Sequence, residues 1–344
     1  MNTSTSPDRP VLSVERLTID FGPRRVVDEL SFALQRGRTL CIAGESGSGK
    51  SLTSLAIMGL LPRAASVPGG AIIFEGRDLL GLPERQLQPL RGKRLGMIFQ
   101  EPMTSLNPLM TVGQQLEETL RRHEPLGRRE IAWRAREMLD AVRMPHAEKR
   151  LAQYPHELSG GMRQRVMIAM AMLCRPDVLI ADEPTTALDV TIQAQIMALL
   201  LKLQRERGMG LILITHDLAV VAEMGEARPA DGAAASPGAR VAVMYAGQIV
   251  ETGPVPALFD APRHPYTQAL LAAIPEHNKG ARRLSALPGI VPGALDRPTG
   301  CLLGPRCARA QPQCRAERPA LVDGVRCFFP GLPGTASPQE AAHV

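Results

Sequence analysis

The sequence predicts an α/β protein built around a parallel β-sheet, and this prediction rests on three observations. A continuous apolar segment, residues 38–44, has the composition of a strand that is buried on both faces. A glycine-rich turn follows it at once, and residues 51–61 then carry apolar residues at helical spacing. Further apolar runs of strand length alternate with helical segments, at residues 96–99, 178–182 and 211–215. Strands and helices that alternate in this order form parallel sheets.

The other elements are predicted from periodicity in the same way. Residues 11–21 and 29–34 alternate apolar and polar side chains, as half-buried strands do. Helical segments are predicted at residues 112–143, 159–174 and 189–207, and a strand at residues 241–245. Residues 226–240 are rich in Ala, Gly, Pro and Ser and predict a mobile surface loop.

Length and composition favour one large domain with an appendage. The 344 residues exceed a single domain of about 250 residues. A hydrophobic content of 44% and a mean hydropathy of −0.04 are typical of a soluble globular protein. No apolar run approaches the roughly 20 residues of a spanning helix, and the polar start does not resemble a secretory signal. We therefore expect the chain to stay in the cytoplasm and to reach a membrane only through partners.

The net charge of +6 is interpreted as a solvated basic surface. Aromatic residues make up only 3% of the chain, so the stacking platforms of single-strand binders are scarce and no nucleic-acid partner is expected. The best functional alternative for the basic surface is contact with anionic lipid headgroups.

A phosphate-binding loop is predicted where the first buried strand ends. Residues 44–51 fit the pattern G-x-x-x-x-G-K-[ST], whose glycines let backbone N–H groups surround phosphate oxygens at a helix N-terminus. Lys50 is expected to reach the β- and γ-phosphates, and the Ser51 hydroxyl to bind Mg²⁺. The predicted ATP-binding residues here are Gly44, Glu45, Ser46, Gly47, Ser48, Gly49, Lys50, Ser51 and Leu52.

An acidic pair ends another buried strand. Asp182 is expected to bind Mg²⁺, directly or through water, as in P-loop NTPases generally. Glu183 is in a position to polarise an attacking water. Such a pair can instead cap a helix, but the phosphate-binding loop in the same chain favours the catalytic interpretation.

Residues 158–164, Leu-Ser-Gly-Gly-Met-Arg-Gln, resemble the LSGGQ signature of ABC ATPases. Physically this is a second anion site, because Ser159 caps a helix whose first N–H groups are exposed by Gly160 and Gly161. A second phosphate site is useful only if two chains share each nucleotide. In the family, the P-loop of one subunit and the signature of the other enclose ATP. The expected signature residues are Ser159, Gly160, Gly161 and Gln164.

Other residues match further elements of this family. Phe21 resembles the aromatic residue that stacks on adenine, although a Phe at a strand end is as often part of the core. Gln100 resembles the glutamine that senses the γ-phosphate and Mg²⁺, and Asp189 belongs to a loop that touches the opposite subunit. His216 resembles the switch histidine of the γ-phosphate. The resemblance thus implies catalytic roles for Glu183, His216 and Gln100, with Mg²⁺ bound by Ser51, Gln100 and Asp182.

Three longer segments, residues 97–116, 154–172 and 263–275, are similar to the ATP-binding subunits of bacterial dipeptide, oligopeptide and nickel importers. This resemblance implies a P-loop NTPase core of the ABC ATPase type with a helical subdomain and an antiparallel β subdomain. The implied divisions are a nucleotide-binding domain at 10–275, with its helical subdomain at about 101–165, and a Pro- and Cys-rich extension at 276–335. Residues 1–9 and 336–344 are expected to be disordered.

The four cysteines of the tail are separated by five, six and twelve residues. Thiols clustered in a cytosolic chain favour a metal or cluster site over disulfides, but this spacing leaves a cluster, zinc and ordinary reduced thiols open. The resemblance to peptide-importer subunits implies a [4Fe–4S] cluster held by Cys301, Cys307, Cys314 and Cys327. Cys41 and Cys174 are expected to be core residues.

The resemblance implies an ATP-hydrolysing subunit that powers uptake of di- and oligopeptides. Alternative solutes are nickel and glutathione, and a rival class is a soluble ABC ATPase that acts on nucleic acid. The implied partners are a second, non-identical ABC ATPase subunit, two integral membrane permeases and an extracytoplasmic solute-binding protein. The implied location is the cytoplasmic face of the bacterial inner membrane.

Overall fold

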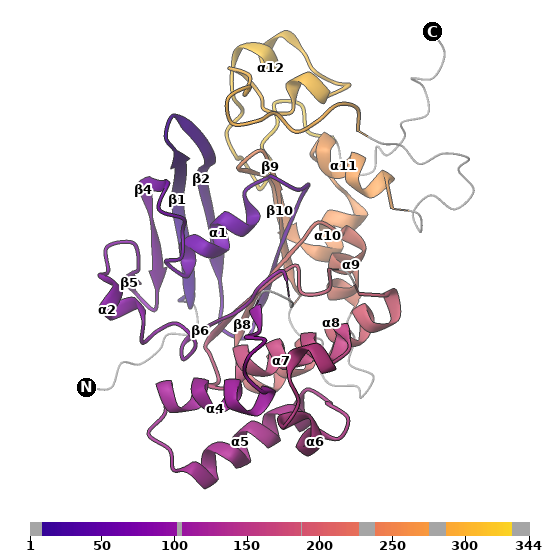
Figure 1. The fold of residues 1–344 in the computed structure, drawn as a ribbon. Coiled ribbons are helices and arrows are strands. Elements are labelled where there is room, and N and C mark those ends of the chain that lie inside the picture. Colours follow the sequence, from indigo (N-terminus) through magenta and orange to yellow (C-terminus); the bar gives the residue numbers. More distant parts are fainter. Residues whose placement is uncertain (1–8, 102–104, 187, 227–237, 275–286, 332–344) are drawn as a thin grey trace.

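The computed structural model describes residues 9–101, 105–186, 188–226, 238–274 and 287–331. Figure 1 shows a central sheet with a smaller sheet on one side, a group of helices at the bottom and a C-terminal extension at the top. The predicted loop at 226–240 and the ends expected to be disordered fall largely outside the described residues, as does the predicted boundary near 276. Among the described residues, none of the helices has the length and apolarity needed to cross a membrane.

The larger sheet has six strands in the order β10-β9-β3-β8-β7-β6. All its neighbouring strands pair in parallel except β10, which runs antiparallel at one edge. Every residue of β3, β7 and β8 is buried, as their continuous apolar runs predict. The strands are β3 (Thr39–Ala43), β6 (Leu95–Ile98), β7 (Val178–Asp182), β8 (Gly210–Thr215), β9 (Arg240–Tyr245) and β10 (Gln248–Pro254).

The smaller sheet is antiparallel, with the strand order β2-β1-β4-β5. Its apolar residues join one face of the larger sheet in a single cluster, and the helices after β6 cover the other face. The strand β3 shows this division: Leu40 and Ile42 belong to one cluster, and Cys41 and Ala43 to the other. The strands are β1 (Leu12–Phe21), β2 (Arg24–Leu34), β4 (Ala65–Phe74) and β5 (Arg77–Asp78).

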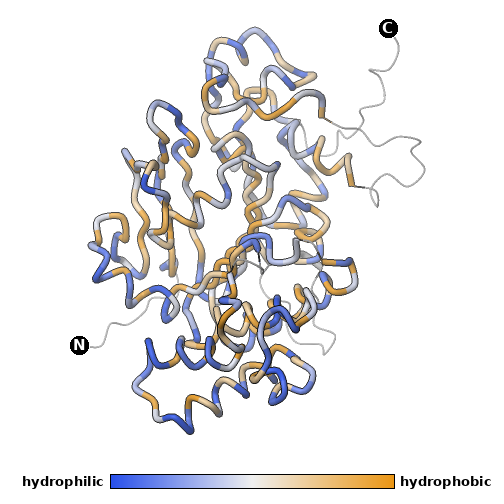
Figure 2. The backbone as a smooth tube through the Cα atoms, viewed as in Figure 1, coloured by the Kyte–Doolittle hydropathy of each residue, from blue (hydrophilic) through white to orange (hydrophobic). Residues whose placement is uncertain are grey.

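Helices cover both sides of the larger sheet. On the side of the smaller sheet lies α1 (Lys50–Ile57), with the short α2 (Glu84–Leu87) nearby. Apolar residues are concentrated along the central strands and hydrophilic ones along α4 and α5, as Figure 2 shows. The opposite side carries α4 (Val112–His123), α5 (Arg128–Ala141), α6 (Ala147–Leu151), α7 (Gly160–Met172), α8 (Val190–Arg207), α9 (Leu218–Glu226), α10 (Val255–Asp260) and α11 (Pro265–Ala272).

The prediction of one helix over residues 112–143 is wrong. The structure has two helices, α4 and α5, separated by residues 124–127. This connection contains Pro125, which cannot donate a helical hydrogen bond, and Gly127, the residue before α5. The start of α4 is firmly specified, because the side chains of Thr111 and Gln114 form a capping box.

The described part of the extension, residues 287–331, has little regular structure: α12 (Pro312–Ala316) and a 3₁₀ turn at Gly304–Arg306. It is nevertheless joined to the core. Leu302 and Leu303 are buried in the larger apolar cluster, and the side chain of Arg318 forms an ion pair with Asp28 of β2 at 3.0 Å. The apolar pair between the first two tail cysteines therefore anchors the extension by burial.

Candidate nucleotide-binding site

The P-loop connects β3 to α1 at the carboxyl end of the central strand. Gly44, at φ 154°, lies so close to β9 that an added Cβ would come within 2.1 Å of the Met244 carbonyl oxygen. Gly49 precedes α1 in a left-handed conformation, at φ 98°. The first N–H groups of α1 have no acceptor within the helix, and the helix dipole favours an anion there. The loop thus has the form of a phosphate cradle, as predicted from the motif.

The Lys50 ammonium lies inside this loop. Its Nζ donates to the carbonyl oxygens of Gly44 at 2.7 Å and Glu45 at 2.9 Å. Burial lowers the pKa of Lys50, and the nearby carboxylates of Glu183 and Asp182 oppose that shift. The side chain is therefore held as a desolvated cation at the point where phosphate oxygens would enter.

Asp182 lies at the end of β7, facing the start of α1. Its carboxylate accepts hydrogen bonds from the hydroxyls of Ser51 at 3.2 Å and Ser54 at 3.4 Å. Burial raises the pKa of Asp182, because little solvent reaches its charge. A carboxylate and a hydroxyl oxygen are ligands that Mg²⁺ prefers, so Ser51 and Asp182 fit the predicted cation site.

Glu183 is surrounded by hydrogen-bonding side chains. Its carboxylate accepts from Nε2 of Gln100 and from the hydroxyl of Thr186, both at 3.0 Å. The other carboxylate oxygen lies 3.1 Å from Nδ1 of His216. The structure thus brings together the three residues predicted to be catalytic, and Thr186 is a fourth residue of this group that the sequence did not indicate.

The signature segment begins α7. Ser159 caps this helix, since its hydroxyl accepts from the Met162 N–H at 3.4 Å, and Gly160 and Gly161 form the first turn. Gln164, also expected in the signature site, is only 2% exposed and lies among the buried residues of α7. The helix α7 packs in one apolar cluster and α1 in the other, so the two helices lie on different sides of the sheet.

Two further predicted residues lie at element ends. Asp189 caps α8, its carboxylate accepting from the Ile192 N–H at 2.9 Å, and the next residue, Val190, is 82% exposed. Phe21 ends β1 and is half-buried against the smaller apolar cluster. The exposed start of α8 at Asp189 and Val190 is suited to contact with another chain, and the Phe21 ring lies partly in the core and partly at the surface.

Two residues that the sequence analysis left without a function touch the P-loop. The Tyr266 hydroxyl accepts a hydrogen bond from the Glu45 N–H at 3.0 Å, and Nη1 of Arg306 lies 3.2 Å from both carboxylate oxygens of Glu45. The sequence signal for Tyr266 is that His264-Pro265-Tyr266 lies in the segment 263–275, whose resemblance to importer subunits nucleotide chemistry does not explain.

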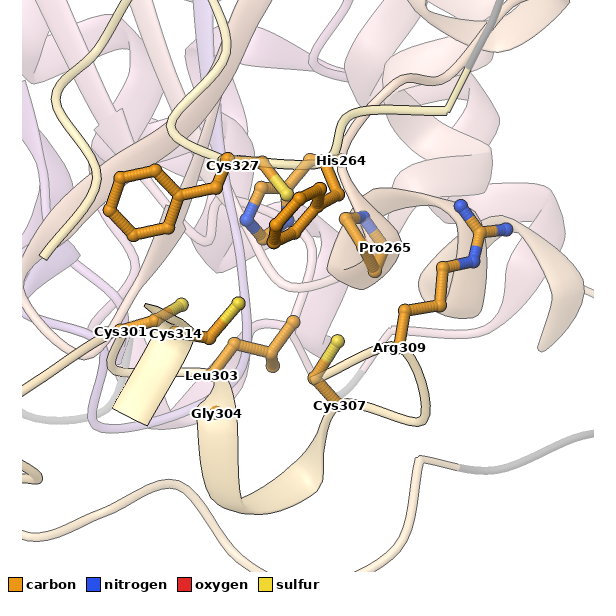
Figure 3. A pocket seen from close by; sticks show the side chains of 11 residues that line it. His264, Pro265, Cys301, Leu303, Gly304, Cys307, Arg309, Cys314 and Cys327 are labelled. Carbon is orange, nitrogen blue, oxygen red and sulfur yellow. The ribbon is translucent and has the colours of Figure 1, made fainter. Parts of the chain in front are cut away.

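The four tail cysteines line one cavity together with His264, as Figure 3 shows. Burial raises the pKa of Cys301, Cys307 and Cys327, and backbone N–H groups at each of these sulfurs oppose the shift. Among the described residues, no group of three or more His, Cys, Asp or Glu side chains is placed to hold a single metal ion. The thiols therefore converge without forming a mononuclear site.

Family comparison agrees with this geometry. Residues 27–186 match the ABC transporter family, and residues 250–314 match the C-terminal region of oligopeptide/dipeptide transporters. The chain is 51% identical over 329 residues to the dipeptide transport ATP-binding protein DppD of Escherichia coli, covering 93% of this chain and 97% of that protein. It is 53% identical over 315 residues to DppD of Haemophilus influenzae, covering 90% and 92%.

Solved structures give the same result for the fold. The dimeric ATP-binding cassette MJ0796, in a post-hydrolysis state bound to ADP and Pi, matches with a TM-score of 0.60 at 26% identity, over 71% of this chain and 98% of that one. The transporter component cbiO1 from Clostridium perfringens matches with a TM-score of 0.62 at 26% identity, over 73% and 91%. With its cradle, cation-site residues and Glu183 cluster, the chain belongs to the ATP-hydrolysing subunits of ABC transporters, in their oligopeptide/dipeptide family.

Proposed function

We propose that this subunit hydrolyses ATP to power the uptake of di- and oligopeptides. The observation that carries the ATPase is the position of Glu183, held by Gln100, Thr186 and His216 beside the P-loop lysine. The choice of peptides is supported by the match of residues 250–314 and by the names of the DppD relatives. Nickel, glutathione or another small solute is the alternative cargo.

Glu183 orients the water that attacks the γ-phosphate. Its carboxylate accepts hydrogen bonds from Gln100 and Thr186, which fix its direction and leave it a lone pair to receive a proton from water. Lys50 and the N–H groups of the P-loop hold the phosphates and spread the charge that develops on them. His216, 57% exposed, is free to turn from Glu183 toward the γ-phosphate.

Ser51, Asp182 and Gln100 are the residues that would hold Mg²⁺. Asp182 provides a buried carboxylate and Ser51 a hydroxyl 3.2 Å from it, and the Gln100 amide carbonyl would supply a third oxygen ligand. The bound cation supplies charge neutralisation at the β- and γ-phosphates. It also offsets the cost of burying the Asp182 carboxylate.

Two ATPase subunits share each nucleotide in this proposal. Because α1 and α7 lie on opposite sides of the sheet, the Ser159 turn of one chain serves the nucleotide bound by the P-loop of the other. Asp189 and exposed Val190 contribute to the same interface, and Phe21 stacks on the adenine. Gln164 supports α7 from its buried side. The second subunit is a related but non-identical ATPase.

The proposed domains are consecutive along the chain. Residues 10–275 form the nucleotide-binding domain, in which about 101–165 are the helical subdomain, and 276–335 form the extension. The subunit acts at the cytoplasmic face of the bacterial inner membrane with two permeases and an extracytoplasmic solute-binding protein.

We also propose that Cys301, Cys307, Cys314 and Cys327 hold a [4Fe–4S] cluster. In such a cluster each iron takes one thiolate, so four convergent thiols suit it better than a single ion. Its role is structural, since the extension has little regular structure of its own. Anaerobically purified protein should contain iron and sulfide and absorb light at about 400 nm. Their absence would eliminate this proposal.

Co-purification tests the transport function against its rival. The tagged subunit, expressed with its neighbouring genes, should be recovered from membranes together with two integral membrane proteins. Retention on DNA that weakens with salt, without those proteins, would instead favour the nucleic-acid class.

A further inference from the structure

Tyr266 carries a contact from α11 to the P-loop. His264 caps α11, its Nδ1 accepting from the Tyr266 N–H at 3.1 Å, and Pro265 occupies the first helical position, where it needs no donor. Tyr266 is fully buried, and its hydroxyl accepts from the Glu45 N–H at 3.0 Å. The three-residue motif thus directs one hydroxyl at the residue after Gly44.

Arg306 meets the same P-loop residue from the extension. Its Nη1 contacts both carboxylate oxygens of Glu45 at 3.2 Å and the Tyr245 hydroxyl at 3.3 Å. Its Nε donates to the Pro288 carbonyl at 2.8 Å. Since the guanidinium is only 8% exposed and is held on several sides, it is a fixed partner for the Glu45 carboxylate.

Glu45 connects these contacts to Lys50. Its N–H is bound by Tyr266, its carboxylate by Arg306, and its carbonyl accepts from Lys50 Nζ at 2.9 Å. A displacement of Glu45 therefore moves one of the two carbonyl oxygens that place the ammonium. The phosphate-binding cation is in this way tied to residues more than 200 positions away along the chain.

The position of Arg306 in the extension adds a second link. It ends the 3₁₀ turn that lies between Cys301 and Cys307, in which the Gly304 N–H donates to the Cys301 carbonyl and the Cys307 N–H to the Gly304 carbonyl. The guanidinium direction is thus set by the turn that carries two of the cavity thiols.

We propose that Arg306 is a positioning residue of the nucleotide site: by fixing Glu45 it sets the place of Lys50, so that phosphate affinity depends on the folded thiol-bearing turn. This inference rests on the proposed ATP site. In this proposal Arg306 acts through Glu45, whose carboxylate its guanidinium contacts.

The test measures the dissociation constant of MgATP for the purified full-length chain by calorimetry. Arg306→Met should raise it about tenfold, within the usual range of coupling between sites. Arg306→Lys should recover part of the loss, because it keeps the charge without the fork. Arg318→Met is the matched control, since it removes another extension-to-core ion pair, with Asp28 rather than the P-loop, and should change affinity less than about twofold.

A double variant separates positioning from general stability. Glu45→Gln should weaken MgATP binding as Arg306→Met does, and combining the two should add nothing further, because both break one path. Unchanged affinity in Arg306→Met, or fully additive losses in the double variant, would overturn the proposal. Lys50→Ala distinguishes a failure of the Arg306 proposal from a failure of the proposed ATP site. This variant should abolish MgATP binding, and retained binding would contradict the ATP site itself.

Discussion

At the scale of single residues, Glu183 is held by groups from three parts of the chain. Gln100 follows β6, Thr186 follows β7 and His216 follows β8. Glu183 itself has a left-handed backbone, at φ 47°, and its N–H donates to the Ile214 carbonyl at 2.9 Å. Such a backbone conformation costs about 1–3 kcal/mol in a residue other than glycine. The geometry therefore supports a catalytic role for Glu183.

Replacing Glu183 by Gln should separate binding from turnover. The amide keeps the shape and can still bond Gln100 and Thr186, but it cannot accept a proton from the attacking water. We expect kcat for ATP to fall by a factor on the order of 100 or more, with the MgATP dissociation constant within about threefold of wild type. Glu148→Gln, at an exposed position of α6, is the control. Wild-type turnover by Glu183→Gln would remove this residue from its role.

Asp182 allows a test of the cation site through stability. Burial raises its folded-state pKa above the unfolded value of 3.8, so the folded protein holds this proton to higher pH than the unfolded chain does. The free energy of unfolding consequently falls as pH rises from 3.8 through the higher folded-state pKa, because the folded protein must then bury a charged carboxylate. Asp182→Asn should therefore have a Tm at or above wild type at pH 7 without Mg²⁺. Added MgATP should raise the Tm of wild type but not of the variant. An equal rise in both would exclude Asp182 from the site.

Among the helices and strands, the N-termini of α1 and α7 are the two proposed anion sites. The glycines before α1 and at the start of α7 leave first-turn N–H groups accessible, and Ser159 caps α7 with its hydroxyl. The helices α1 and α7 belong to different apolar clusters, and under the proposed function the α7 site serves a nucleotide bound by another chain.

A bulky cation at the second site should prevent subunit pairing without harming the first. Ser159→Arg places a side chain across the α7 N-terminus, so nucleotide binding by the P-loop should persist while ATP-dependent association with the partner ATPase is lost. Thr111→Ala is the control for lost stability. It also removes a helix cap, at α4, and should lower the free energy of unfolding by about 1 kcal/mol. The association of Glu183→Gln subunits with the partner ATPase, measured by light scattering in the presence of MgATP, tests this prediction. Normal pairing of Ser159→Arg would contradict the shared site.

Sequence patterns predicted some elements well and others poorly, for physical reasons. Continuous apolar runs predicted β3, β7 and β8, because strands buried on both faces have no polar positions. No alternation of apolar and polar residues predicts the strand β4, since Val67-Pro68-Gly69-Gly70 interrupts it and only two of its ten residues are buried. The break between α4 and α5 was missed because apolar spacing continues on both sides of Pro125.

Across the whole molecule, the P-loop is contacted by residues whose contacts no local pattern could predict. The P-loop and the Asp182–Glu183 pair were predictable, since each is contiguous in the chain and its chemistry requires those residue types. Tyr266 and Arg306 reach Glu45 across 221 and 261 residues, and only tertiary packing determines such contacts. The extension therefore contacts the P-loop through Arg306 and also carries the four thiols.

The decisive measurement of this subunit's function is uptake of a labelled dipeptide into membrane vesicles, with ATP supplied on the side of this subunit. The complex contains the permeases, the solute-binding protein and either wild-type subunit or Glu183→Gln. The wild-type complex should accumulate dipeptide only with MgATP, and the variant complex should reduce the rate by a factor on the order of 100 while still binding nucleotide. Equal uptake by both complexes, or none by a wild-type complex that hydrolyses ATP, would mean that ATP hydrolysis at Glu183 does not power dipeptide uptake.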